Sequence, residues 1–157
     1  MVNPEKPIIW VDADSIPQKA KSVILKAAKK NCVPVVYAAN RNIPFTEESP
    51  LFTMRICENA PDAADNLILE GARTGDMVIT RDIPLAAKIL EKGICVINDR
   101  GTRFSSENIQ KFLEQREESL FISALGIQPA RPHKTYGDKE LHAFSCCFDK
   151  ALHELLD

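Results

Sequence analysis

The segment IIWVDADSIP, residues 8–17, predicts both the first strand and the first helix of this chain. An apolar run that ends in aspartate is typical of a buried strand that reaches the edge of its sheet. The next residues change to a helical period, with apolar side chains recurring on one face over residues 15–31. Asp12 and Asp14 therefore stand at the junction between a strand and a helix. Because two carboxylates this close repel each other, a helix N-terminus, a shared proton or a metal ion must stabilise them.

The remainder of the chain repeats this alternation of strand and helix. Four further strands are expected, at residues 32–38, 51–57, 77–80 and 94–97. Helices are expected at residues 62–73 and 83–93 and in two segments after residue 105, the first broken within 114–118. Strands that alternate with helices form right-handed βαβ units around a parallel sheet. We predict a three-layer α/β fold with a central, mostly parallel sheet of about five strands and helices on both faces. We expect one domain, residues 1–157, which helices from about residue 105 complete.

The composition excludes several classes of protein. The formal net charge of −2 excludes a strongly basic nucleic-acid-binding domain. No apolar run approaches the length of a membrane span, and the N-terminus does not resemble a signal peptide. The five cysteines are odd in number and form no CxxC motif, which indicates reduced thiols rather than a disulfide framework. We expect a cytoplasmic protein that makes no membrane contact.

Acidic residues follow several of the predicted strands. Asp12 and Asp14 follow the first strand, Asp82 the fourth, and Asp65 lies in the first turn of the helix after the third. Ligands of open parallel sheets bind beyond the carboxyl ends of the strands, so these four acids are expected at one edge. Hard cations such as Mg²⁺ or Mn²⁺ bind carboxylate oxygens and would relieve the repulsion. We predict that the four acids form a metal-binding catalytic pocket; Asp99, after the last strand, is left outside it.

Helix capping is the competing interpretation of some of these acids. Asp62 and Asp82 stand at expected helix N-termini, where a carboxylate accepts backbone N–H bonds. Ser15 and Gln18 match a capping box at the first helix, and Ser105 or Ser106 is expected to cap the helix after residue 105. Since Ser15 would already cap the first helix, capping does not explain Asp12.

Three segments in this order resemble one family of bacterial proteins. They are VDADSIP at residues 11–17, PDAADNLIL at residues 61–69 and GDMVITRDIPLAAKILEKG at residues 75–93. In these segments the chain resembles the YaiI/YqxD-type family of uncharacterised proteins, which is assigned to the PIN-like fold. The resemblance runs from about residue 8 to residue 101, with weaker support from the helical C-terminal third.

The resemblance implies a divalent-metal-dependent nuclease that hydrolyses phosphodiester bonds, with RNA as the expected substrate. PIN-like nucleases take their acids from the end of the first strand, a central helix and the end of the fourth strand. By position these acids are Asp12, Asp65 and Asp82, with Asp14 as an additional acid beside Asp12. Many PIN ribonucleases carry a glutamate on the central helix, where this chain has the shorter Asp65. Asn40 and Arg41, which follow the second predicted strand, are expected to contact the substrate phosphate.

Two other functions compete with the nuclease. A haloacid-dehalogenase-like phosphatase would use Asp12 as nucleophile and Asp14 as general acid, with Thr80, Lys88 and Asp99 in supporting positions. Against it, a helix begins directly after the acids, where such enzymes need a loop and flap, and Lys88 falls inside a helix. The second alternative is a non-catalytic PIN-like module that binds nucleic acid or a protein. The near-neutral charge does not discriminate between this module and the nuclease.

Overall fold

A five-stranded parallel sheet forms the centre of the protein. The computed structural model describes residues 7–60, 62–127 and 135–157. The strands are β1 (Ile9–Asp12), β2 (Val35–Ala39), β3 (Phe52–Ile56), β4 (Met77–Ile79) and β5 (Cys95–Ile97). Their order in the sheet is β3-β2-β1-β4-β5, and every neighbouring pair is parallel. The parallel sheet of about five strands is therefore confirmed, with β1 at its centre.

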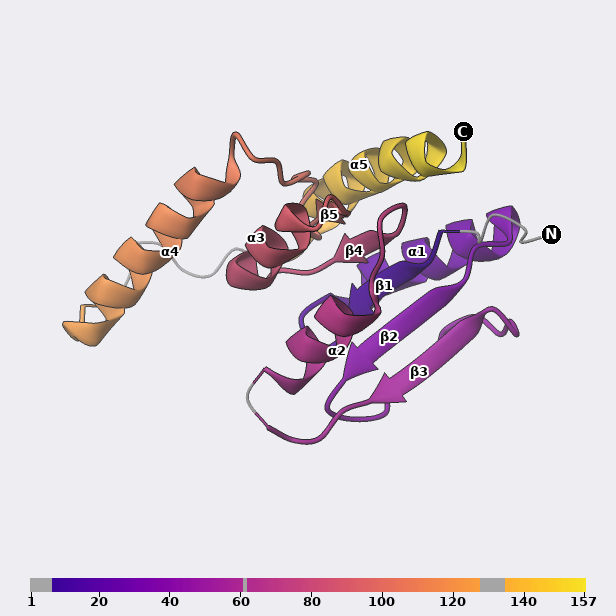
Figure 1. Ribbon diagram of the computed structural model, residues 1–157, viewed down its shortest axis with the longest axis horizontal. Helices are drawn as coiled ribbons and strands as arrows, with labels where there is room; N and C mark the ends of the chain where they lie inside the picture. The colour runs from indigo at the N-terminus through magenta and orange to yellow at the C-terminus, as the bar shows by residue number, and fades with distance from the viewer. Residues whose placement is uncertain (1–6, 61, 128–134) are drawn as a thin grey trace.

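Helices cover both faces of this sheet, as Figure 1 shows. They are α1 (Gln18–Asn31), α2 (Ala63–Gly71), α3 (Ile83–Glu91), α4 (Ile109–Ala124) and α5 (Asp138–Leu156). One core joins α1 and α5 to the sheet, and a second core joins α2 and α3 to the other face. The three-layer α/β fold is confirmed. In the described part of the chain, no helix is both long and apolar enough to cross a membrane.

The central strand β1 contributes to both cores because its side chains alternate. Ile9 and Val11 pack toward α1 and α5, whereas Trp10 packs toward α2 and α3. The indole N–H of Trp10 donates a hydrogen bond of 3.1 Å to Asp76 Oδ2. A side chain at Gly71 would collide with the Trp10 ring, so only glycine fits there. This packing fixes β1, and with it the acidic residues at its carboxyl end.

Three predicted helix ends are wrong. Helix α1 begins at Gln18 with Pro17 at its N-cap and no side-chain cap, because the Ser15 hydroxyl donates to Asp12 instead. The N-cap of α4 is Asn108, with which Ser105 exchanges two hydrogen bonds in the turn before the helix. Asp62 occupies the N-cap position of α2 in a left-handed conformation, but its side chain makes no capping bond.

The predicted break within α4 is also wrong. The helix runs without interruption from Ile109 to Ala124. Its sequence contains neither glycine nor proline, and its glutamates, glutamines and arginine favour helix. Figure 1 shows α4 projecting from the body of the protein. Part of the expected loop at residues 126–137 lies outside the described residues.

Candidate functional site

The four predicted acids line one pocket at the carboxyl edge of the sheet. Its volume is about 210 Å³. Asp12 is the last residue of β1, Asp82 follows β4, and Asp65 lies in the first turn of α2. Asn40 and Asp62 line the same pocket. The structure thus brings together side chains that lie up to 70 residues apart in the chain.

Asp12 is the most buried of the four acids, with 7% of its surface exposed. Its Oδ2 accepts hydrogen bonds from the hydroxyls of Thr80, at 2.8 Å, and Ser15, at 3.0 Å. Burial raises the pKa of Asp12, these two hydrogen bonds lower it, and the charges of Asp82 and Asp14 raise it further. Both of these hydrogen bonds go to Oδ2, and none is recorded for Oδ1 among the described residues.

Thr80 joins two of the acids and was not predicted as a site residue. It is fully buried between β4 and α3. Its hydroxyl donates to Asp12 and accepts the backbone N–H of Asp82 at 3.0 Å. Each hydroxyl has one donor and spare acceptor capacity, so Thr80 satisfies both groups at once. In the sequence, Thr80 is recognisable only as a hydroxyl at the end of a strand, a feature that also suits the phosphatase alternative.

Asp65 and Asp82 form a repelling carboxylate pair. Asp82 caps α3 as predicted, with Oδ1 accepting the N–H of Leu85 at 3.0 Å. Burial raises the pKa of Asp65 to about 7, together with the charges of Asp82 and Asp12 and a hydrogen bond to Asp82. Asp65 therefore keeps its proton to a higher pH than an ordinary aspartate does. A bound cation would replace this proton. We call Asp12, Asp65 and Asp82 the acid cluster.

Asp14 differs from the acid cluster because both of its oxygens are already bonded. Oδ2 accepts the backbone N–H of Asn40 at 2.9 Å, and Oδ1 lies 3.4 Å from Nε of Arg41. The Arg41 side chain is 77% exposed and lies beside the pocket rather than among its lining residues. Asn40 and Arg41 thus hold Asp14 at the rim of the pocket.

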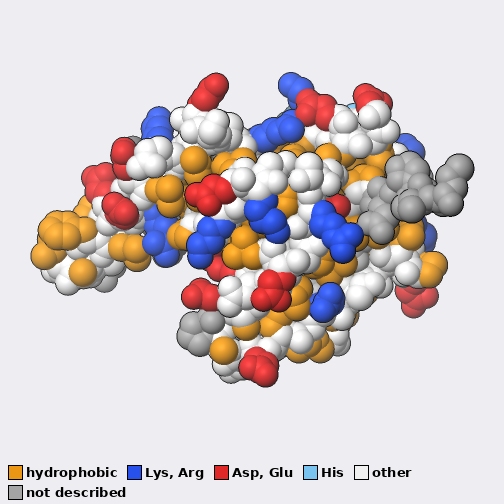
Figure 2. Space-filling view, in the orientation of Figure 1, with side chains coloured by type: hydrophobic (Ala, Val, Ile, Leu, Met, Phe, Trp, Pro, Cys, Tyr) orange, Lys and Arg blue, Asp and Glu red, His pale blue; other side chains and the backbone are white. Residues whose placement is uncertain are grey.

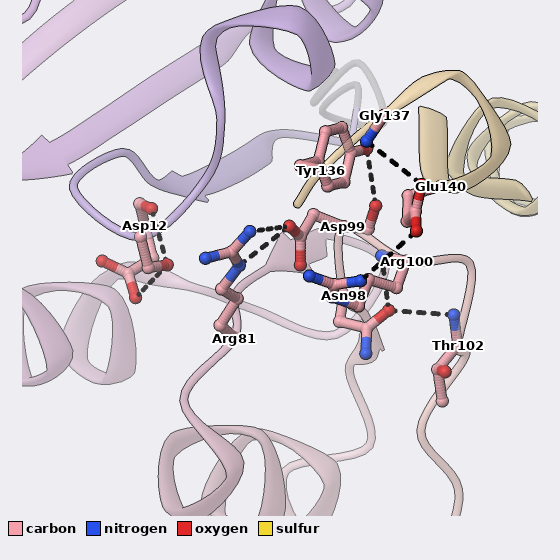
Figure 3. A network of polar contacts seen from close by, with 10 residues as sticks. Asp12, Arg81, Asn98, Asp99, Arg100, Thr102, Tyr136, Gly137 and Glu140 are labelled. Atoms are coloured by element: carbon pink, nitrogen blue, oxygen red, sulfur yellow. Dashed lines mark hydrogen bonds and ion pairs between the residues drawn. The ribbon is translucent and has the colours of Figure 1, made fainter. Parts of the chain in front are cut away.

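A second polar network lies next to the acid cluster, at the end of β5 (Figure 3). Asp99 is 1% exposed, and its Oδ2 accepts from Nε of Arg81 at 2.8 Å and from Nη2 at 2.5 Å. Asp99 Oδ1 is buried and has no hydrogen-bond partner among the described residues. The Tyr136 hydroxyl donates to the Asp99 carbonyl at 2.7 Å. Figure 3 shows Arg81 between Asp99 and Asp12, with two of its nitrogens directed toward Asp99.

These positions do not assemble the site of a haloacid-dehalogenase-like phosphatase. Thr80 is buried and bonded to Asp12, so its hydroxyl is not presented to a phosphate. Lys88 and Asp99 do not line the pocket that contains Asp12. Asp99 is bonded to Arg81 instead.

The donor chemistry of the acid cluster suits a hard divalent cation. In residues 7–60, 62–127 and 135–157, no three His, Cys, Asp or Glu side chains converge closely enough to hold an ion among them. Mg²⁺ does not require such a set, because it keeps several waters and takes one or two carboxylates together with substrate phosphates. Among the residues that the structure describes, no ion pair joins a basic side chain to a carboxylate of the acid cluster. The acid cluster therefore fits an ion that also binds a substrate phosphate.

Comparison with known proteins identifies related sequences. Residues 10–154 match the family described as "Uncharacterized BCR, YaiI/YqxD family". The chain is 41% identical to the UPF0178 protein of Treponema denticola over 148 residues, which cover 94% of this chain and 93% of that protein. The UPF0178 protein of Psychromonas ingrahamii is 36% identical over 92% of this chain and 94% of its own length. That of Psychrobacter cryohalolentis is 38% identical over 87% and 93%. No solved structure matches the chain significantly.

Proposed function

The chain belongs to the YaiI/YqxD family, and from this premise we propose that it is a divalent-metal-dependent nuclease that hydrolyses phosphodiester bonds in RNA. The observation that carries the proposal is that Asp12, Asp65 and Asp82 line one pocket and that, in the part of the chain that the structure describes, none of them forms an ion pair. The positions of Asp12, Asp65 and Asp82 along the chain support the PIN-like assignment that the resemblance implies. The reducing cytoplasm suggested by the cysteine content is a compartment in which RNA is available.

The acid cluster would hold Mg²⁺ or Mn²⁺. When bound, the ion supplies a water of lowered pKa and neutralises charge that develops on the phosphate. Ser15 and Thr80 orient Asp12 through hydrogen bonds to its Oδ2, which would leave Oδ1 for the ion. Asp14, fixed at the rim by Asn40 and Arg41, would contact the ion through water or accept a proton from the attacking water.

Asn40 and Arg41 are proposed to contact the substrate phosphate. Arg41 donates one N–H to Asp14, and a guanidinium has five such donors, so several are left for phosphate oxygens. Its exposed side chain can reach a substrate without the opening of any core contact. Arg41 would thus position the phosphate over the acid cluster.

Cleavage of a labelled single-stranded RNA with Mn²⁺ or Mg²⁺ tests the proposal. The wild type should cleave the RNA, and EDTA should abolish this cleavage. Asp12→Asn and Asp82→Asn should each lose activity. Glu70→Gln is the matched control, because Glu70 is an exposed acid on α2 outside the pocket. Its activity should equal that of the wild type.

Two results would refute the nuclease. Cleavage that persists in both aspartate variants would indicate a contaminating enzyme. A wild type that binds RNA but cleaves none of several substrates at high enzyme concentration would indicate the non-catalytic binding module. A covalent aspartyl intermediate on Asp12 whose formation is sensitive to beryllofluoride would instead support the phosphatase.

A further inference from the structure

A groove of about 340 Å³ continues the acidic pocket between α2, α3 and α4. Asp62, Asp65 and Asp82 line both hollows, so the two are contiguous. The groove differs from the pocket in its charge, because Lys88 of α3 and Arg116 of α4 line it as well. Any ligand that binds at the acids can therefore extend directly toward two cations.

Lys88 and Arg116 are available to a ligand. Both side chains belong to exposed residues, and neither forms an ion pair with a carboxylate of the described residues. Figure 2 shows Lys and Arg side chains where α3 and α4 meet, next to Asp and Glu side chains. A cation without an acidic partner beside an anionic pocket is suited to bind an anion.

The distance along α3 separates these cations from the acids. Lys88 follows Asp82 by six residues, which corresponds to about 9 Å at a rise of about 1.5 Å per residue. A ligand that reaches from the acid cluster to the backbone of Lys88 spans this rise along α3. Lys88 is thus placed for the neighbouring phosphate of a longer ligand. Phosphates that repeat at intervals along a flexible chain are the property of a polynucleotide.

The groove also has an apolar wall. Leu69 of α2 and Pro84 of α3 line it and are partly buried, with Leu85 fully buried behind them. Ligand sites commonly combine such apolar walls with a few polar groups that fix orientation. A base or sugar can pack on Leu69 and Pro84 while its phosphate is paired by the cations.

We propose that this groove is the subsite for the nucleotide that neighbours the scissile phosphodiester. Lys88 and Arg116 contact its phosphate, and Leu69 and Pro84 pack against its base or sugar. The inference rests on the proposed nuclease function and adds to it that α4 binds substrate. A role in binding also accounts for the position of α4, which packs on α3 and has no buried residue of its own.

The test measures binding of a fluorescently labelled single-stranded RNA by anisotropy in EDTA, where the proposed enzyme cannot cleave. The full chain is compared with Lys88→Gln, Arg116→Gln and the double variant. Lys111→Gln is the matched control, because Lys111 is an exposed cation of α4 outside the groove. Each phosphate contact with a single strand contributes about 0.7 to the slope of log K against log salt. The slope should fall by about 0.7 in each single variant and by about 1.4 in the double variant, with no change in the control.

The outcomes separate the groove from the nuclease. A double variant with wild-type affinity and salt slope would overturn the groove, as would a wild type that binds no RNA. Cleavage by the wild type in Mn²⁺ would then still support the nuclease. Conversely, binding that depends on Lys88 and Arg116 without any cleavage would support the groove and overturn the nuclease. Urea denaturation checks folding, and these exposed substitutions should change the free energy of unfolding by less than about 0.5 kcal/mol.

Discussion

Replacing Asp65 by asparagine should stabilise the fold at neutral pH while it weakens metal binding. Burial and the neighbouring charges of Asp82 and Asp12 raise the pKa of Asp65 from 3.8 to about 7. A full shift of this size corresponds to about 4 kcal/mol, since one pKa unit is 1.36 kcal/mol. Because Asp65 is only partly buried, solvent screening reduces the contribution to about 1–2 kcal/mol.

The sign of this effect follows from proton binding. Between pH 3.8 and about 7 the folded protein keeps a proton on Asp65 that the unfolded chain has released. The contribution of Asp65 to stability is therefore fully present below pH 3.8. It decreases as pH rises and is lost above pH 7. Asparagine has no charge, so the Asp65→Asn variant escapes this loss.

Urea denaturation at pH 5 and pH 8 in EDTA measures the difference. At pH 8 Asp65→Asn should unfold with a free energy about 1–2 kcal/mol above that of the wild type, equivalent to roughly 2–8 °C in Tm. At pH 5 the difference should shrink. Glu70 lies on the same helix but outside the acid cluster. The free energy of unfolding of Glu70→Gln should therefore stay within about 0.5 kcal/mol of that of the wild type at both pH values.

Adding Mg²⁺ should reverse the order of stability. At 100 times its Kd, an ion that binds only the folded state stabilises it by about 2.7 kcal/mol, a gain that Asp65→Asn should lack. A variant that is less stable than the wild type at pH 8, or whose difference from it is the same at pH 5, would refute repulsion within the acid cluster. Equal stabilisation of both proteins by Mg²⁺ would place the ion elsewhere.

Three further substitutions test the contacts that support the site. Thr80→Val removes the donor to Asp12 and should lower Mg²⁺ affinity about 10–100-fold in calorimetric titration; unchanged affinity would exclude this supporting role. Gly71→Ala sets a methyl group against the Trp10 ring and should cost about 1–3 kcal/mol in urea denaturation. Phe148→Ala opens a cavity between α5 and the sheet and should cost about 3–5 kcal/mol. A loss below 0.5 kcal/mol in either of the last two would contradict the packing described.

The parallel sheet and the meeting of the acids could be predicted because both follow from local patterns and one topological rule. Apolar runs that alternate with helical periods imply parallel strands, and the carboxyl ends of parallel strands share an edge. Asp12 and Asp82 each follow such a run directly, so their proximity needed no knowledge of side-chain contacts. Asp65 could be added because it lies in the first turn of a helix that begins at that edge.

The hydroxyl contacts could not be predicted, because a local and a long-range partner compete for the same group. Ser15 lies three residues before Gln18 and matches a capping box, but its hydroxyl donates to Asp12. Thr80 reaches Asp12 across 68 residues of sequence, a contact that no local pattern encodes. The side of α4 that faces the body could not be predicted either. Apolar residues are expected on that side, but Leu120 and Phe121 are apolar and exposed.

The pairing of the nearby arginines explains why the repulsion within the acid cluster is not relieved by Arg41 or Arg81. Arg41 is bonded to Asp14, and Arg81 is bonded to the buried Asp99, so these two arginines are committed to other acids. Turning either guanidinium toward the acid cluster would relieve its repulsion, but would leave Asp14 or Asp99 without its partner. For Asp99, which is buried, that loss would be the larger cost. The fold thus places three carboxylates in one pocket at the expense of stability at neutral pH, and a divalent ion bound there, as the proposed function expects, would recover that stability.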